Sequence, residues 1–130
     1  AFYLIIHKNT QALFSNAGHP KSILIRDGNA YPLSVRGVLI GVSQIMKNSF
    51  QTKRIALKPG DKILLYTDGM IESLNSREEE YGIKRLSATA VRHSHKPCEE
   101  MLKAIVSDFT DYTAGENQSD DETLVIIEIR

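Results

Sequence analysis

The feature that most constrains this chain is a short apolar run that stops at a carboxylate. Residues 62–67 follow Pro59 and Gly60, which favour the second and third positions of a tight turn. A run of this length, bounded by turn signals, predicts a strand buried on both faces. Asp68 and Gly69 come directly after it. A carboxylate therefore stands at the end of a buried strand, beside a residue that allows other groups to approach the backbone closely.

Two interpretations of Asp68 follow from the local pattern. Asp is a frequent N-cap, and the residues from Met70 to Leu74 predict a short helix, so Asp68 could cap it. Junctions of this kind are common, and the local pattern by itself favours the cap. The second interpretation is that Asp68 is a ligand.

A second acidic cluster supports the ligand interpretation. Asp120, Asp121 and Glu122 directly precede a predicted strand at residues 123–129. A sheet could bring this strand start next to the strand end at Asp68. Mg²⁺ and Mn²⁺ prefer oxygen ligands of this type. The pattern leaves both readings open, because acids at strand ends also begin loops.

The rest of the chain predicts a β-rich domain with a few helices. Alternation and turn residues indicate a hairpin of residues 2–7 and 12–16, and another of residues 22–26 and 30–33 joined by Asp27-Gly28. We expect a half-exposed strand at residues 49–57, paired through Pro59-Gly60 with the strand at residues 62–67. The segment at residues 38–42 has no clear role.

Two longer helices are predicted after the acidic loop of residues 75–82. The first is indicated by the helical spacing of Ile83, Leu86, Ala90 and Val91. Pro97 fits the first position of the second helix. That helix has a broad apolar stripe which we expect to face the core, formed by Met101, Leu102, Ile105, Val106, Phe109 and Tyr112.

Composition excludes several function classes. The 16 Lys and Arg residues balance the 16 Asp and Glu residues, so no basic footprint for nucleic acid or a membrane surface is present. The apolar runs are far too short to span a membrane. The single cysteine, Cys98, indicates a reducing, cytoplasmic setting. Neither a cysteine-based phosphate loop nor a Ser-His-Asp arrangement is evident.

Three ordered motifs resemble one known family. They are residues 57–73 followed by Tyr81-Gly82, the break Asn16-Ala-Gly-His-Pro20, and the terminal run from Asp120 to Val125. Together they resemble the signature of PPM-type metal-dependent protein phosphatases, in the stage II sporulation protein E branch. The resemblance covers essentially the whole chain. It implies that residues 1–130 are the C-terminal part of a single phosphatase domain.

The resemblance implies an α+β fold and a metal site. The family fold is a β-sandwich flanked by helices on both sides, with its active site at one end. For this chain the resemblance implies a mostly antiparallel sheet with two to three helices, incomplete at the N-terminus. By position, Asp68 and Asp120 match metal ligands, while Gly69, Asp121 and His19 match supporting positions. Two Mg²⁺ or Mn²⁺ ions would activate a water for attack on phosphoserine or phosphothreonine.

One departure from the family is important. The Asp-x-x-Gly-His-Gly motif that carries the metal-bridging aspartate in the family does not occur in these 130 residues. The chain also opens in a predicted strand without an initiator Met. We therefore expect a fragment that is inactive alone, with uncovered sheet edges that favour self-association.

Three functions are consistent with the sequence. The first is a metal-dependent serine/threonine phosphatase acting on a regulatory phosphoprotein, as the resemblance implies, with an anti-sigma-factor antagonist as the expected type of partner. The second is a non-catalytic relative that binds such a phosphoprotein. The third, weaker reading is a structural β-rich domain whose acids serve as caps.

Overall fold

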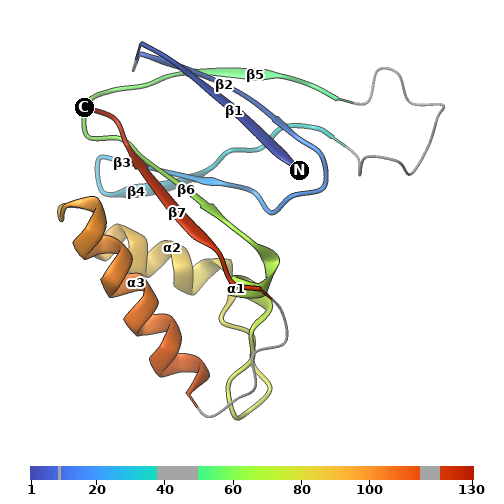
Figure 1. Cartoon of the computed structure of the whole chain (residues 1–130), viewed down its shortest axis with the longest axis vertical. Helices are drawn as coiled ribbons and strands as arrows, with labels where there is room; N and C mark the ends of the chain where they lie inside the picture. Colours follow the sequence, from blue (N-terminus) through green and yellow to red (C-terminus); the bar gives the residue numbers. More distant parts are fainter. Residues whose placement is uncertain (9, 38–49, 115–120) are drawn as a thin grey trace.

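The computed structural model describes residues 1–8, 10–37, 50–114 and 121–130. These residues form two antiparallel sheets and three helices, which confirms the α+β class (Figure 1). The elements are β1 (Phe2–His7), β2 (Gln11–Asn16), β3 (Ile23–Arg26), β4 (Asn29–Pro32), β5 (Lys53–Ala56), β6 (Lys62–Tyr66), α1 (Asp68–Glu72), α2 (Gly82–Arg92), α3 (Cys98–Thr113) and β7 (Leu124–Glu128).

The two sheets form a sandwich with helices on one side. One sheet has three strands in the order β1-β2-β5, and the other has four in the order β4-β3-β6-β7. Figure 1 shows α2 and α3 under the four-stranded sheet, on the face turned away from the other sheet. Both hairpins expected from the sequence are present, the second with Asp27 and Gly28 at positive φ in its turn.

The four-stranded sheet separates two hydrophobic cores. Leu64 and Tyr66 of β6 point to the helix side, where they pack with Leu86 of α2 and Ile105 of α3. Ile63 points to the opposite side and packs between the sheets. Strand β6 is therefore buried on both faces, as its continuous apolar run predicted.

The predicted pairing of residues 49–57 with residues 62–67 is wrong. The strand there is β5, which is shorter and pairs with β2, while β6 pairs with β3 and β7. The turn at Pro59-Gly60 carries the chain from one sheet to the other. The Leu57 N–H donates to the Thr10 carbonyl at 2.8 Å, and the Gly60 N–H donates to the Ile129 carbonyl at 2.8 Å. Ser49 and the segment at residues 38–42 lie outside the described residues.

A buried ion pair holds this crossing in place. Asp61 is only 2% exposed and accepts hydrogen bonds from Arg26 Nε and from the Lys58 N–H, both at 2.8 Å. Arg26 also donates to the Ala56 carbonyl at 2.7 Å. Burial alone would raise the pKa of Asp61, but the bonds from Arg26 and Lys58 outweigh it and hold the pKa below its usual value.

The two long helices agree with their predicted spacing, with two corrections. Pro97 is the N-cap residue of α3 and lies outside the helix, so it is not the first helical residue. The predicted core stripe is too broad: Met101, Ile105 and Phe109 are buried, whereas Val106 is 46% exposed. None of the described helices has the length and apolar character that a membrane span requires.

A polar cluster joins α2 to α3. The carboxylate of Asp108 accepts hydrogen bonds from Tyr81 Oη at 2.8 Å, from Arg85 at 2.9 and 3.0 Å, and from Thr89 Oγ1 at 3.2 Å. The Arg85 guanidinium also stacks over the ring of Tyr112, 4.5 Å from its centroid. The bonds from Arg85 are the largest influence on Asp108 and hold its pKa below the usual value.

Candidate functional site

The end of β6 and the start of β7 lie side by side. In the antiparallel register Tyr66 is opposite Leu124. Asp68 follows β6 and Asp121 precedes β7, so both residues lie at the same end of the sheet. The sequence analysis raised this meeting of the two acidic segments as a possibility, and the structure shows it. Asp120 lies outside the described residues.

Thr67 connects the two segments directly. Its hydroxyl donates to the Asp121 carbonyl at 2.9 Å and accepts from the Thr123 N–H at 2.9 Å. The Thr67 N–H also donates to the Thr123 carbonyl at 3.1 Å. These bonds fix the loop before β7 against the residue that precedes Asp68.

Helix α1 begins at Asp68, which corrects the cap interpretation. Thr67 occupies the N-cap position and makes no side-chain capping bond, and Asp68 is the first helical residue. The Asp68 side chain is exposed, while Gly69 and Met70 behind it are buried. The fold thus presents the Asp68 carboxylate to solvent at the end of a strand that is buried on both faces.

Ser73 makes a second connection across the same junction. Its hydroxyl donates to the Gly69 carbonyl at 2.6 Å, and its Oγ lies 3.4 Å from Oε1 of Glu122. The sequence analysis missed both Thr67 and Ser73. A Thr at a strand end and a Ser after a short helix are ordinary local choices, so the pattern contained no signal for them.

His19 lies at the same end of the four-stranded sheet. β3 runs antiparallel to β6, with Ile23 opposite Leu64, so the start of β3 is next to the end of β6. The Tyr66 hydroxyl donates to the Lys21 carbonyl at 2.7 Å, and burial raises the pKa of Tyr66 to about 12. All three motifs of the sequence analysis therefore reach one end of the sandwich.

The His19 ring is held by local contacts. The side chain of Asn16 accepts from the His19 N–H and donates to the His19 carbonyl, both at 2.8 Å. The ring Nδ1 lies 2.9 Å from the Pro20 carbonyl, and the ring centroid lies 5.9 Å from that of Phe2. These contacts fix the break that leads into β3.

The described residues do not make a complete metal site. Asp68 and Asp121 supply carboxylate oxygens, the donors that Mg²⁺ and Mn²⁺ prefer. However, among the described residues no three His, Cys, Asp or Glu side chains gather closely enough to hold an ion. The acids at this end therefore suit one side of such a site and no more.

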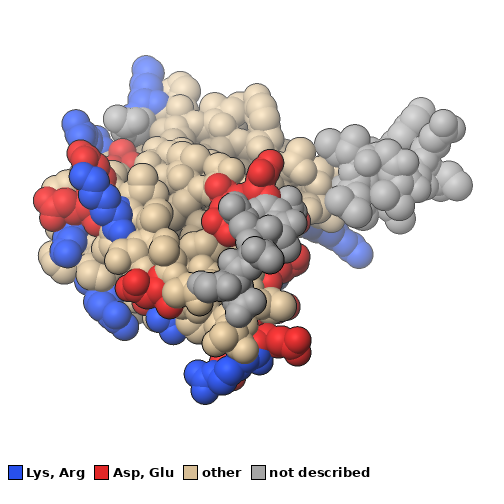
Figure 2. Space-filling model, turned by 60° about the horizontal axis from the view of Figure 1, so that its bottom comes forward, with Lys and Arg blue, Asp and Glu red and all other residues tan. Residues whose placement is uncertain are grey.

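Charged side chains of both signs are present on the face that Figure 2 draws. Figure 2 shows acidic and basic side chains in several small groups on the face drawn there, with no field of one sign across it. An electrostatic surface for a polyanion is not visible on this face.

Comparison with solved structures identifies the fold as that of a PP2C-type phosphatase domain. The phosphatase domain of SpoIIE from Bacillus subtilis, in crystals presoaked with Mn, matches with a TM-score of 0.74 and 18% identity, covering 99% of this chain and 56% of that chain. The SiaA-PP2C domain of Pseudomonas aeruginosa matches with a TM-score of 0.76 and 23% identity, covering 95% and 48%. The RsbU and RsbW domains of Rv1364c from Mycobacterium tuberculosis match with a TM-score of 0.77 and 23% identity, covering 95% and 33%.

The family model described as stage II sporulation protein E matches residues 1–130. The chain belongs to this family, whose members are PP2C-type protein phosphatases, and the resemblance seen in the motifs is confirmed. Protein IcfG of Synechocystis sp. is 29% identical over 128 residues, covering 97% of this chain and 20% of IcfG. The chain thus spans a fifth of this curated relative and between a third and somewhat over half of the three solved chains.

Proposed function

We propose that residues 1–130 are the C-terminal part of a single phosphatase domain that hydrolyses phosphoserine or phosphothreonine on a regulatory phosphoprotein with bound metal ions. The observation that carries the proposal is the pairing of β6 with β7, which places Asp68 beside the acidic segment before β7. Membership of a PP2C-type phosphatase family supports the reaction class.

In this proposal Asp68 and Asp120 are metal ligands, and Gly69, Asp121 and His19 support them. Mg²⁺ or Mn²⁺ would lower the pKa of a bound water and neutralise charge on the phosphate. Further ligands would come from residues outside these 130, because the Asp-x-x-Gly-His-Gly motif of the family does not occur among them. Thr67 and Ser73 would keep the two acidic segments at a fixed separation.

The proposed partner is a phosphoprotein of the anti-sigma-factor-antagonist type. One structural neighbour carries RsbU and RsbW domains in one protein, which supports a regulatory role of this kind. The single cysteine supports a reducing, cytoplasmic compartment.

The direct test uses the parent protein. Phosphate release from a phosphoserine peptide is measured with Mn²⁺ and with Mg²⁺ for wild type, Asp68→Ala and Asp111→Ala, an exposed Asp on α3. We expect Asp68→Ala to lose about 100-fold or more, since loss of a supporting partner alone costs about 10- to 100-fold. Asp111→Ala should retain full activity. Equal activity of wild type and Asp68→Ala would show that Asp68 is not a ligand.

Three further observations separate the alternatives. Residues 1–130 alone should show negligible turnover, and robust Mn²⁺-dependent turnover would contradict the proposal that other residues complete the site. A parent that binds the phosphopeptide but releases no phosphate with either metal would be a binding module instead. An upstream Asp-x-x-Gly-His-Gly motif would support the enzyme, and its loss would support the binding module.

We also propose that the isolated chain self-associates. β1 lies at one end of its sheet order, and on its solvent side Tyr3 is 65% exposed and Ile5 is 41% exposed. Sedimentation velocity over a range of concentrations should show dimers or larger species, and fewer of them after Ile5→Lys. A monomer at all concentrations would refute this.

A further inference from the structure

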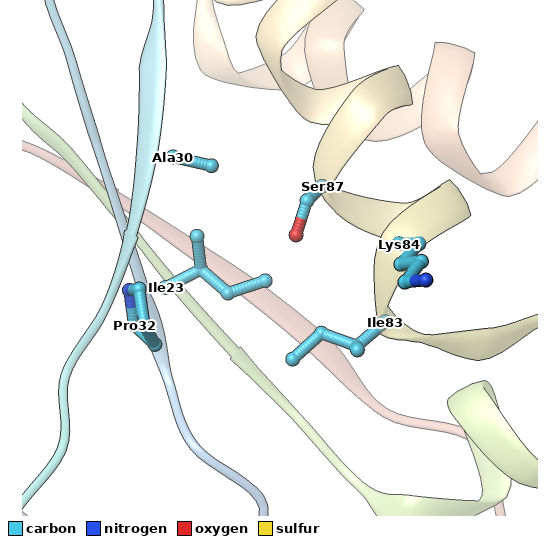
Figure 3. A pocket seen from close by; sticks show the side chains of 6 residues that line it. All are labelled: Ile23, Ala30, Pro32, Ile83, Lys84 and Ser87. Carbon is cyan, nitrogen blue, oxygen red and sulfur yellow. The ribbon is translucent and has the colours of Figure 1, made fainter.

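A groove lies between the β3–β4 hairpin and helix α2. It has a volume of about 360 Å³ and is lined by Ile23, Ala30, Pro32, Ile83, Lys84 and Ser87. Figure 3 shows Ile23 and Ile83 pointing into the groove, with the Ser87 hydroxyl directed into it from α2. The interior is therefore mainly apolar and contains one hydroxyl group.

The groove is large enough for one apolar side chain of a partner. Small residues stand on both sides, Ala30 on β4 and Ser87 on α2, and they leave the space between hairpin and helix unfilled. Ile83 remains 39% exposed at its mouth. Covering this residue and the groove interior would remove apolar surface from water, which favours an apolar occupant.

Lys84 is the one charged residue among those that line the groove. Helix α2 contains Lys84, Arg85 and Arg92 and no acidic residue. Arg85 is paired with Asp108, whereas Lys84 lies in the groove wall and Arg92 is exposed two turns further along the helix. A partner that presents carboxylates beside its apolar side chain would be complementary to this rim.

The neighbouring sheet edge is unsuited to strand addition. β4 is the outer strand of its sheet, and Pro32 within it has no N–H to donate. A partner at this place would therefore be held mainly by side chains in the groove and by charge.

We infer that the groove between β4 and α2 is a docking site for an acidic peptide segment that inserts one branched or aromatic side chain between Ile23 and Ile83, with a carboxylate near Lys84. This site is separate from the junction of β6 and β7, since none of its lining residues belongs to that junction. The inference does not depend on the proposed phosphatase reaction.

The test is an NMR titration of the ¹⁵N-labelled 130-residue chain. The probe is the capped peptide acetyl-Glu-Glu-Leu-Glu-Glu-amide at low ionic strength. We expect saturable shifts centred on the amides of Ala30, Ile83, Lys84 and Ser87. The peptide with Ala in place of Leu should bind about tenfold more weakly or worse, because burying a Leu side chain is worth at least that factor. The peptide with Gln in place of Glu should also bind more weakly, and added salt should remove that difference.

Two matched pairs of variants locate the site. Ser87→Leu should fill the groove and abolish binding, while Ala88→Leu, on the exposed side of the same helix, should leave it unchanged. Lys84→Glu should weaken binding, while Lys53→Glu on β5 should not. Circular dichroism melting of each variant checks that the fold is retained.

Several outcomes would overturn the inference. These are the absence of saturable shifts, shifts confined to the exposed face of β1 and β2, or equal binding by the Gln peptide. Unchanged binding by Ser87→Leu in a folded variant would exclude the groove. Shifts of groove amides on dilution of the chain alone would assign the groove to a second copy, and the acidic-segment proposal would be wrong.

Discussion

The hydroxyl of Thr67 donates a hydrogen bond to the carbonyl oxygen of Asp121 at 2.9 Å, across 54 positions of sequence. The hydroxyl oxygen of Thr67 in turn accepts a hydrogen bond from the Thr123 N–H. One side chain therefore joins the end of β6 to the residues that lead into β7. Because Asp68 is the next residue, the position of its backbone relative to the second acidic segment depends on this contact.

Replacement of Thr67 should loosen that junction. Thr67→Val removes both hydrogen bonds at nearly constant shape, and we expect a loss of about 1–2 kcal/mol in the free energy of unfolding, as for two partly exposed bonds. Thr67→Ser keeps the hydroxyl and should lose less. Urea unfolding measures the energies, and amide exchange at Thr123 should accelerate in Thr67→Val only. Unchanged exchange at Thr123 would contradict the connecting role.

Amide replacement of the acids at the two ends of β6 should change the free energy of unfolding by very different amounts. Asp68 is exposed in the first turn of α1, so Asp68→Asn should change the free energy of unfolding by about 0.5 kcal/mol or less. Asp61 is buried and paired with Arg26, so Asp61→Asn should lose about 2–4 kcal/mol. Chemical denaturation of both variants tests this. A large loss for Asp68→Asn would indicate a structural role for that carboxylate.

The cluster around Asp108 should make stability depend on pH. The hydrogen bonds from Arg85 lower the pKa of Asp108 in the folded chain. The resulting stability is present above the unfolded-state pKa of about 3.9 and is lost as the pH falls through the lower folded-state pKa. Asp108→Asn should therefore cost about 1.5–3 kcal/mol in the free energy of unfolding at pH 7. This difference from wild type should begin to shrink as the pH falls below about 4 and should close below the folded-state pKa of Asp108.

Urea unfolding between pH 3 and pH 7 measures this dependence. The control is Asp111→Asn, which changes an exposed Asp on the same helix. Its free energy of unfolding should depend on pH in nearly the same way as that of wild type. If the difference in the free energy of unfolding between wild type and Asp108→Asn stayed unchanged down to pH 3, the pairing of Asp108 with Arg85 could not be the cause of that difference.

Two adjacent residues of α3 should differ sharply in their cost of truncation. Ile105 is fully buried and Val106 is 46% exposed. Ile105→Ala should lose about 2–5 kcal/mol through lost burial and a cavity, whereas Val106→Ala should stay within about 0.5 kcal/mol of wild type. Thermal and urea unfolding of the pair test the orientation of α3. Similar losses at both positions would show that α3 is rotated from the position found here.

The strands and long helices could be predicted because their patterns are local. The apolar run of β6 and the helical spacing in α2 each fix an element and its buried face. The partner of β5 could not be predicted. A Pro-Gly turn has the same sequence whether it joins two strands of one sheet or crosses between two sheets, and here the contacts of Leu57 and Gly60 with distant residues select the crossing.

The candidate site was predictable at the level of segments and not of contacts. The sequence showed Asp68 and Asp121 to lie next to the ends of predicted strands. Antiparallel pairing of β6 with β7 then brings the two residues to the same end of the sheet. Thr67 and Ser73 hold that place together through bonds to residues about fifty positions away, and no local pattern encodes such partners. The cap reading of Asp68 was wrong, because α1 begins at Asp68 itself.

The division of β6 between two cores limits how this domain can vary. Ile63 and Leu64 are neighbours in the chain but belong to different cores. A single inserted residue within β6 would send every following side chain to the opposite core and displace Asp68 by about 3.3 Å along the strand. Changes of length should therefore be found in turns such as Asp27-Gly28, while β6 keeps a constant length in folded variants.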